Sequence, residues 1–171
     1  MKRLLRGTLA VLFTALCHSV FAASEGPEGP VVLTVSGHLE QLDLTTPARF
    51  DLATLKQLPV HQISTQTPWE EGTHLYVGFD PNDLLAQLNV PGDVIRLTAF
   101  NHYITEVPLT DFSSHRAIIA YAMDNQDISI RNKGPLMVVY DFDQYPELRN
   151  EAYYGRSIWQ IQALQVLMPE Q

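Results

Sequence analysis

The chain has 171 residues and a formal net charge of −8, and 46% of its residues are hydrophobic and 18% charged. This composition is typical of a globular protein and excludes a disordered or collagen-like chain. A single cysteine excludes an intramolecular disulfide and a cysteine zinc cluster. The negative charge argues against nucleic acid and anionic lipid as partners, and the length predicts one domain.

The first 22 residues have the pattern of an export signal. Three basic residues stand among the first six, and an apolar run follows from residue 9 to residue 16. Val20 and Ala22 suit signal peptidase, so the sequence predicts a cleaved signal peptide over residues 1–22 and a periplasmic location. The apolar run is short for a bilayer span, and an uncleaved anchor is the alternative.

Cleavage after Ala22 changes the charge and the chemistry of the mature chain. It removes three basic residues and no acidic one, so the net charge becomes −11. It also removes Cys17, and the exported protein then has no thiolate to offer a metal. Two glycines and two prolines predict a flexible leader over residues 23–30, followed by one domain over residues 31–171.

The first elements of this domain are a strand and a short helix. The β-branched run Val31–Ser36 predicts a strand that ends at Gly37. Residues Asp51–Leu58 predict a helix, because Asp51 can cap it, three leucines recur at helical spacing and Pro59 ends it.

A second helix and a strand follow. Residues Asp80–Asn89 predict a helix capped by Asp80, with Pro81 in its first turn, where the missing N–H costs nothing. Residues Val94–Phe100 predict a strand. Its buried face is expected to hold Ile95, Leu97 and Ala99.

The rest of the chain predicts more strands. Ala117–Met123 is an unbroken apolar run typical of a buried strand, and Asp127–Ile130 can pair back onto it. The sequence also predicts strands over Leu136–Tyr140 and Ile158–Val166. One face of the last strand is expected to hold Trp159, Ile161 and Ala163. Many short strands with a few short helices predict an α+β fold with a β-rich mixed-sheet or barrel-like core.

Common catalytic signatures are missing from the sequence. No two of the five mature histidines have the spacing of a helical zinc site, and there is no Gly-x-Ser-x-Gly elbow and no glycine-rich phosphate loop. The histidines, which we expect to be scattered and hydrogen-bonded at the surface, are His38, His61, His74, His102 and His115.

Four segments place polar and aromatic residues next to predicted strand ends. They are Thr65–Trp69, Asn101–Tyr103, Arg131–Pro135 and Arg156–Gln160. Turn residues and core aromatics would explain any one of them taken alone.

Together the segments resemble the oxidoreductase molybdopterin-binding domain, which has the fold of sulfite oxidase, and most of all its small exported stand-alone members. The similarity runs from about Val31 to Val166. Its strongest stretches are Phe50–Leu52 with Leu55 and Leu58–Pro59, Thr65–Trp69, Asp83–Leu85, Leu97–Ala99 with Asn101 and Tyr103, Lys133–Pro135 with Val138–Tyr140, and Ser157–Gln160.

The sequence departs from this family at three places. His102 stands where relatives commonly have Asp, and Ile158 stands where the enzymes tend to have a Lys before Trp159. The enzymes bind molybdenum through a pyranopterin dithiolene and one protein cysteine, which would be expected near Thr65–Trp69. A thiolate is a soft anionic ligand that Ser and Thr replace poorly. Sulfite-oxidase chemistry by the usual route is therefore not expected.

The remaining groups suit a small, uncharged pterin. Aromatic rings can stack on its flat face, and fixed polar groups can bind its donor and acceptor edge. We expect a cavity lined by the two tryptophans and polar neighbours. The predicted ligand-binding residues are Thr67, Trp69, Asn101, Tyr103, Lys133, Gly134, Arg156, Ser157 and Trp159, with no catalytic and no metal-binding residue. For each of them a role in the core, in a turn or as a solvated charge is the alternative.

The resemblance implies a periplasmic pterin-binding protein without catalytic turnover. Like stand-alone relatives of this kind, such a protein would present a pterin to the periplasmic region of an inner-membrane signalling protein with cyclic-di-GMP domains. No cofactor is then required. The alternatives are a molybdenum-cofactor oxidoreductase subunit that lacks the cysteine ligand, and an interaction module whose pocket has closed.

Overall fold

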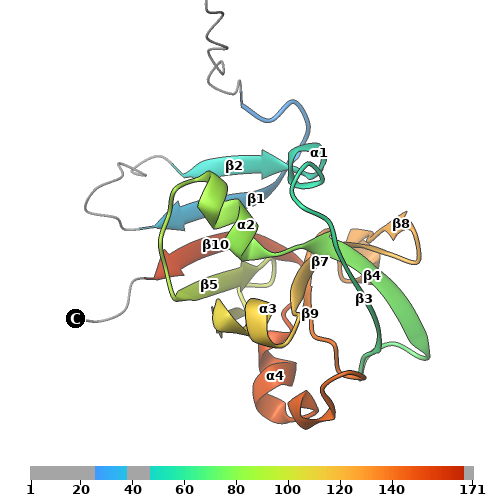
Figure 1. Cartoon of the computed structure of the whole chain (residues 1–171). Helices are drawn as coiled ribbons and strands as arrows, with labels where there is room; N and C mark the ends of the chain where they lie inside the picture. Colours follow the sequence, from blue (N-terminus) through green and yellow to red (C-terminus); the bar gives the residue numbers. More distant parts are fainter. Residues whose placement is uncertain (1–25, 38–46, 168–171) are drawn as a thin grey trace, which may run out of the picture.

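The computed structural model describes residues 26–37 and 47–167. The predicted signal peptide, His38 and the last four residues lie outside these ranges. No helix in the described part of the chain is long and apolar enough to cross a membrane. Two sheets stand side by side, with the last helix below the junction between them (Figure 1).

The first sheet has the strand order β2-β1-β10-β5-β6. Strand β1 is parallel to β10, and the other neighbours are antiparallel, so the sheet is mixed. The bounds are β1 Val31–Gly37, β2 Ala48–Asp51, β5 Val94–Ala99, β6 Ile104–Pro108 and β10 Ile161–Leu167.

The second sheet has the order β3-β4-β7-β8, and β9 also pairs with β7. All its pairings are antiparallel. The bounds are β3 His61–Gln66, β4 Thr73–Phe79, β7 Ile118–Met123, β8 Gln126–Asp127 and β9 Met137–Val139.

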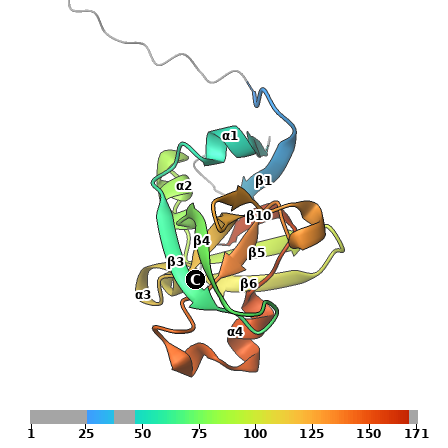
Figure 2. The ribbon, with the colours of Figure 1, turned by 90° about the vertical axis from the view of Figure 1, so that its right-hand side faces the viewer.

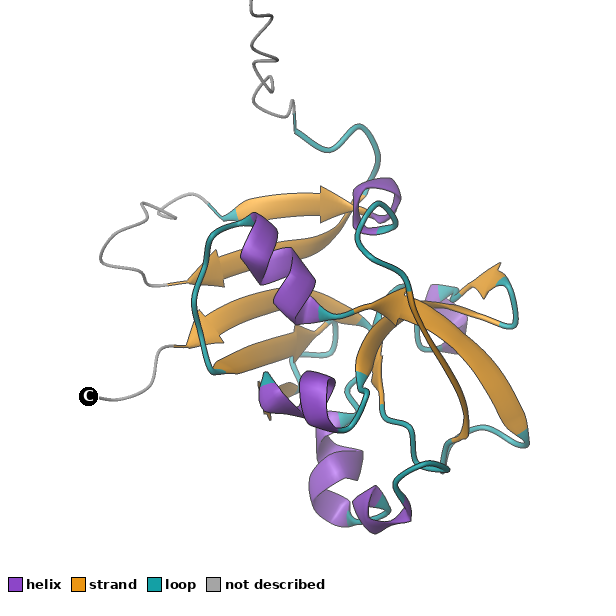
Figure 3. Ribbon diagram, in the orientation of Figure 1, coloured by secondary structure: helices purple, strands orange, loops and turns teal. Residues whose placement is uncertain are grey.

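The helices are short and lie around the sheets (Figure 3). They are α1 Leu52–Leu55, α2 Pro81–Gln87, α3 Thr110–Ser114 and α4 Glu151–Arg156, with 3-10 turns η1 Ile130–Asn132 and η2 Pro146–Leu148. Short helices beside two β-sheets confirm the predicted α+β class.

The buried side chains form two clusters, a large one that includes Leu33, Ile95 and Leu164 and a small one around Ile63 in the second sheet. Ile95, Leu97 and Ala99 are buried together, as the alternation in β5 predicts. Trp69 packs against both clusters.

Several predicted bounds are wrong in detail. Helix α1 ends at Leu55, and the predicted Asp127–Ile130 strand is a two-residue strand followed by a 3-10 turn. The last strand begins only at Ile161, and its pairing with β5 shifts register between Ile161 and Ala163. This bulge moves the inward face to Ile161, Leu164 and Val166, while Trp159 stays outside the strand and partly exposed. A register shift exchanges the two faces of a strand, which simple alternation cannot anticipate.

Asp51 fixes the start of the domain, as its predicted role as a helix cap suggests. One carboxylate oxygen accepts a hydrogen bond from the Thr54 N–H at 2.8 Å, and the other accepts one from the Gly29 N–H at 2.8 Å. Hydrogen bonding by Thr54, and then by Gly29, lowers the pKa of the Asp51 carboxyl. The bond to Gly29 holds the described end of the predicted leader against helix α1.

We predict that Asp51→Asn lowers the melting temperature at pH 7 by roughly 3–6 °C, because the amide has one acceptor oxygen for two N–H donors. The folded-state pKa lies below the unfolded value of about 3.9. The carboxylate therefore stabilises the fold above that pH, and this contribution disappears as the pH falls through the folded pKa. Thermal unfolding from pH 7 to pH 3 should show the variant and the unmodified chain converging.

The matched control is Asp80→Asn. At Asp80, the cap of α2, a single oxygen accepts both bonds from Asn82, so an amide preserves the cap. Burial raises the pKa of the Asp80 carboxyl, so removing its charge should not destabilise the fold at pH 7. An Asp51→Asn variant as stable as the unmodified chain at pH 7 would contradict the assignment.

Candidate functional site

The segment between α4 and β10 joins the two sheets. The Val138 N–H donates to the Ile158 carbonyl at 2.8 Å, and the Ile161 N–H donates to the Leu136 carbonyl at 3.1 Å. The Phe100 N–H, at the end of β5, donates to the Gln160 carbonyl at 3.0 Å. These bonds join the Arg156–Gln160 segment to residues next to two other segments singled out in the sequence, Asn101–Tyr103 and Arg131–Pro135.

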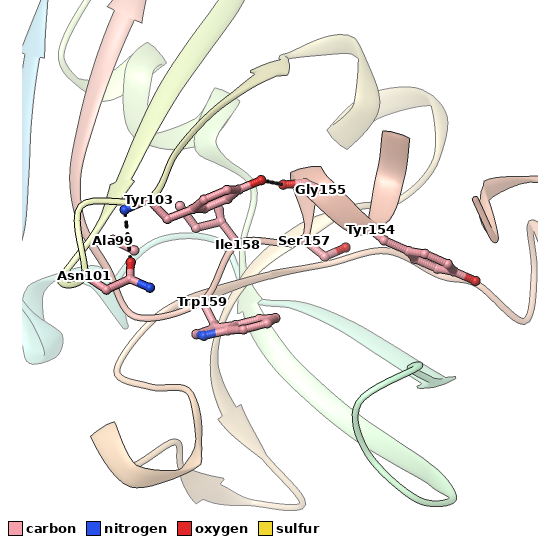
Figure 4. A pocket seen from close by; sticks show the side chains of 8 residues that line it. All are labelled: Ala99, Asn101, Tyr103, Tyr154, Gly155, Ser157, Ile158 and Trp159. Carbon is pink, nitrogen blue, oxygen red and sulfur yellow. Dashed lines mark hydrogen bonds between the residues drawn. The ribbon is translucent and has the colours of Figure 1, made fainter. Parts of the chain in front are cut away.

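A cavity of about 210 Å³ lies at this junction. The β5–β6 connection and the chain that leaves α4 form its walls. Its lining residues are Ala99, Asn101, Tyr103, Tyr154, Gly155, Ser157, Ile158 and Trp159. Figure 4 shows the rings of Tyr103 and Trp159 on opposite sides, with Asn101 towards one end and Tyr154 towards the other.

The aromatic walls remain partly exposed, and local hydrogen bonds hold one of them in place. Tyr103 is 46% exposed and Trp159 39% exposed. The Tyr103 hydroxyl donates to the Gly155 carbonyl at 2.9 Å, which ties the β5–β6 turn to α4. Two aromatic faces across a small cavity form a slot for a flat ring.

Polar groups stand at the edge of this slot. The Asn101 carboxamide oxygen accepts the Tyr103 N–H at 3.0 Å, and its amide nitrogen makes no hydrogen bond to the described residues. The Ser157 hydroxyl donates to the Tyr153 carbonyl at 2.8 Å and keeps its lone pairs available. The slot thus offers a free amide donor and a hydroxyl acceptor beside two rings.

Trp69 does not line the cavity, which corrects the expectation that both indoles would. Its ring centroid lies 5.9 Å from that of Trp159 and 6.5 Å from that of Tyr154 in α4. In the rotated view of Figure 2 the β3–β4 hairpin that carries Trp69 runs towards α4. Trp69 therefore buttresses the cavity wall.

Three buried polar atoms in or near Trp69 make no hydrogen bond within the described part of the chain. They are the Trp69 indole nitrogen, the Thr67 hydroxyl and the Tyr76 hydroxyl, none of which has a hydrogen-bond partner among the described residues. Burial raises the pKa of the Tyr76 phenol. The Thr67 side chain lies close enough to the Tyr76 phenol to oppose this rise in pKa, so the two hydroxyls can satisfy each other. Because buried polar groups are normally satisfied, the Trp69 indole nitrogen is the position where a water molecule or ligand group is expected.

Lys133 and Gly134 lie beside the indole pair, outside the cavity lining. The Lys133 ammonium pairs with the Glu70 carboxylate, next to Trp69. The Lys133 carbonyl accepts the Gln160 N–H at 3.0 Å, next to Trp159. A side chain at Gly134 would place its Cβ 1.8 Å from the Ile128 carbonyl oxygen, so only glycine fits there.

Arg156 does not line the cavity. Its guanidinium donates to the buried Asp111 carboxylate at 2.9 Å, and the Tyr140 hydroxyl donates to the same oxygen at 2.7 Å. Burial, and then the hydrogen bond to Asp111, raises the pKa of Tyr140. Arg156 thus anchors the end of α4 to Asp111 in α3.

The structure therefore gathers Asn101, Tyr103, Ser157 and Trp159 around one cavity. The other five predicted residues lie outside the cavity lining, in the segments around it: Thr67, Trp69, Lys133, Gly134 and Arg156. The cavity residues missing from the prediction are Ala99, Tyr154, Gly155 and Ile158. Tyr154 and Gly155 directly precede the Arg156–Gln160 segment, and their helix is too short to show a clear periodicity.

Histidines and carboxylates do not form a metal centre in the described ranges, where no group of three His, Cys, Asp or Glu is placed to hold an ion. His61 and His74 pair with surface carboxylates, as expected of hydrogen-bonded surface histidines, whereas the His115 Nδ1 is buried and makes no hydrogen bond to the described residues, contrary to that expectation. His102 is exposed in a left-handed turn with φ 64°.

No family model matches the chain, and no curated protein matches it. Among solved structures it is similar to the sulfane dehydrogenase SoxCD from Paracoccus pantotrophus, with a TM-score of 0.54 and 15% sequence identity. The match covers 78% of this chain and 37% of that one. The chain has a sulfite-oxidase-like α+β fold. At this identity the likeness shows the fold alone.

A cysteine-ligated molybdenum does not fit the residues present. The only cysteine, Cys17, precedes the described domain. In the segment where the ligand would be expected, the buried Thr65 hydroxyl accepts the Asp143 N–H at 3.1 Å, and Thr67 offers only a second hydroxyl. Neutral hydroxyls replace a thiolate poorly for a soft metal site.

We predict that Gly134→Ala destabilises the fold by more than about 3 kcal/mol, because the new methyl group would meet backbone rather than a flexible side chain. Thermal unfolding and soluble yield measure the effect. Gly155→Ala is the matched control, since its Cβ would meet the Tyr103 hydroxyl at an ordinary 3.6 Å. Equal stability of the two variants would contradict the close packing at Gly134.

Proposed function

We propose that this chain is a periplasmic pterin-binding protein without catalytic turnover, which presents its ligand to the periplasmic region of an inner-membrane signalling protein linked to cyclic-di-GMP. The observation that carries the proposal is the slot between Tyr103 and Trp159, with the free Asn101 amide at its edge. A pterin has the matching shape, a flat bicyclic ring with donors and acceptors along its rim.

The size of the slot supports a small ligand. Sites for drug-sized ligands typically occupy about 300–1,000 Å³, and this cavity has about 210 Å³. That volume favours a single bicyclic ring over a larger cofactor with a dithiolene and a phosphate tail. The described residues thus fit the binding of a pterin ring better than the ligation of a molybdenum ion.

The signalling role rests on the family resemblance and on the openness of the site. A ligand between Tyr103 and Trp159 would remain accessible at its outer edge, since both rings are partly exposed. A receptor could then distinguish loaded from empty protein, which requires a coupling of about 1–3 kcal/mol.

The alternative is a molybdenum-cofactor oxidoreductase subunit without a cysteine ligand. The fold shared with the sulfane dehydrogenase SoxCD favours it, and the chemistry of the Thr65–Trp69 segment opposes it. Metal analysis of the exported protein separates the two, because stoichiometric molybdenum would contradict the proposal.

We predict that a reduced or oxidised pterin binds at one-to-one stoichiometry and quenches tryptophan emission. The chain's two tryptophans are Trp69 and Trp159, so the whole indole signal reports on the site. Trp159→Ala should weaken binding at least about tenfold in isothermal titration calorimetry, since an aromatic wall and its buried area are lost.

Val60→Ala is the control for this prediction. Val60 is another exposed apolar side chain, at 56%, and lies outside the cavity lining. It should leave the affinity unchanged. Absence of saturable binding by the folded protein at high pterin concentration would contradict the proposed function and favour a module whose pocket has closed.

A further inference from the structure

The ion pair between Lys133 and Glu70 lies where the two indole-bearing segments meet. Glu70 directly follows Trp69, and the Lys133 backbone pairs with Gln160, directly after Trp159. Each of the two side chains is 26% exposed, so the pair is partly shielded from solvent. Screening is weaker there than on an open surface, and the charges influence what can bind beside them.

The position of Lys133 is rigidly determined. Its backbone is left-handed, with φ 72°, at the end of η1. The Gln160 side chain donates to the Ile130 carbonyl at 2.8 Å, and the Gly134 N–H donates to the Ser129 carbonyl at 2.8 Å. The loop therefore fixes the backbone from which the Lys133 side chain extends, and the ion pair with Glu70 positions its ammonium group.

Without Glu70, this cation would attract anionic ligands. The other predicted cation, Arg156, is neutralised by buried Asp111. Arg131 is exposed and forms no ion pair with the described residues, so water and salt screen its charge. Glu70 is therefore the carboxylate whose removal would leave the Lys133 cation unpaired at this junction.

We infer that Glu70 is a specificity-determining residue, which pairs with Lys133 so that the site selects uncharged pterins over anionic ones. This inference rests on the proposed function and adds a charge filter to it. An anionic substituent would have to compete with the Glu70 carboxylate for Lys133, or approach that carboxylate unpaired. A hydroxylated substituent meets neither obstacle.

The test compares two probes that share one ring, 6-hydroxymethylpterin, which is uncharged, and pterin-6-carboxylate, which is anionic. The unmodified chain should bind the uncharged probe at least about fivefold more tightly. Glu70→Gln keeps the shape of the side chain and frees Lys133. It should tighten binding of the carboxylate by about threefold to tenfold, with less than a twofold change for the uncharged probe.

Two further variants isolate the cause. Adding Lys133→Gln to Glu70→Gln should abolish the gain, and high salt should reduce it in the single variant. Glu106→Gln removes the same charge from an ion pair with Arg96 that lies outside the cavity lining, and it should change neither affinity.

The outcomes separate this inference from the proposed function. If the unmodified chain binds the uncharged probe and Glu70→Gln leaves the ratio of the two affinities unchanged, the charge filter is overturned and pterin binding stands. An equal gain for both probes overturns it too. If no variant binds either probe, the proposed function fails, and the inference fails with it.

Discussion

The site depends on one short stretch of backbone, residues 157–161, which is bonded to both sheets. Its carbonyls and N–H groups pair with β9 on one side and with the end of β5 on the other. Because these groups are fixed, Ser157 and Trp159 are held against the β5–β6 turn that carries Asn101 and Tyr103. The cavity is thus a consequence of how two sheets are joined, and its walls come from segments more than fifty residues apart.

Two cations at this junction, Arg156 and Lys133, are paired within the protein. Asp111 in α3 neutralises Arg156 at the end of α4, and Glu70 neutralises Lys133 beside the indole pair. The segment that would supply a thiolate in a sulfite-oxidase-type enzyme supplies hydroxyls, one of them already bonded to the backbone. In the described residues these features place hydroxyls and internally paired charges around the junction, which suits the neutral ring that we propose as the ligand.

The sequence predicts the class of the fold, and four of the nine candidate residues line the cavity, while particular residues show where prediction stops. Apolar residues alternate with others along β5, so the burial of Ile95, Leu97 and Ala99 could be predicted. Asp51 and Asp80 are N-cap residues, and they mark the start of their helices in the sequence. The bulge after Ile161 could not be foreseen, because one extra residue reverses a strand's faces without a signature of its own. The partners of Lys133 and Arg156 come from distant segments, and a pattern along the chain contains no information about such pairing.

The indole N–H resonances in a ¹H–¹⁵N NMR spectrum test the central claim most directly, because the chain has only two tryptophans and each reports on a different part of the site. Trp159 lines the slot, and the unpartnered Trp69 nitrogen lies behind it. On addition of a pterin, both indole signals should shift together and saturate at one equivalent. If backbone amide signals elsewhere in the domain change their chemical shifts while both indole signals stay in place, a binding site at this junction is contradicted.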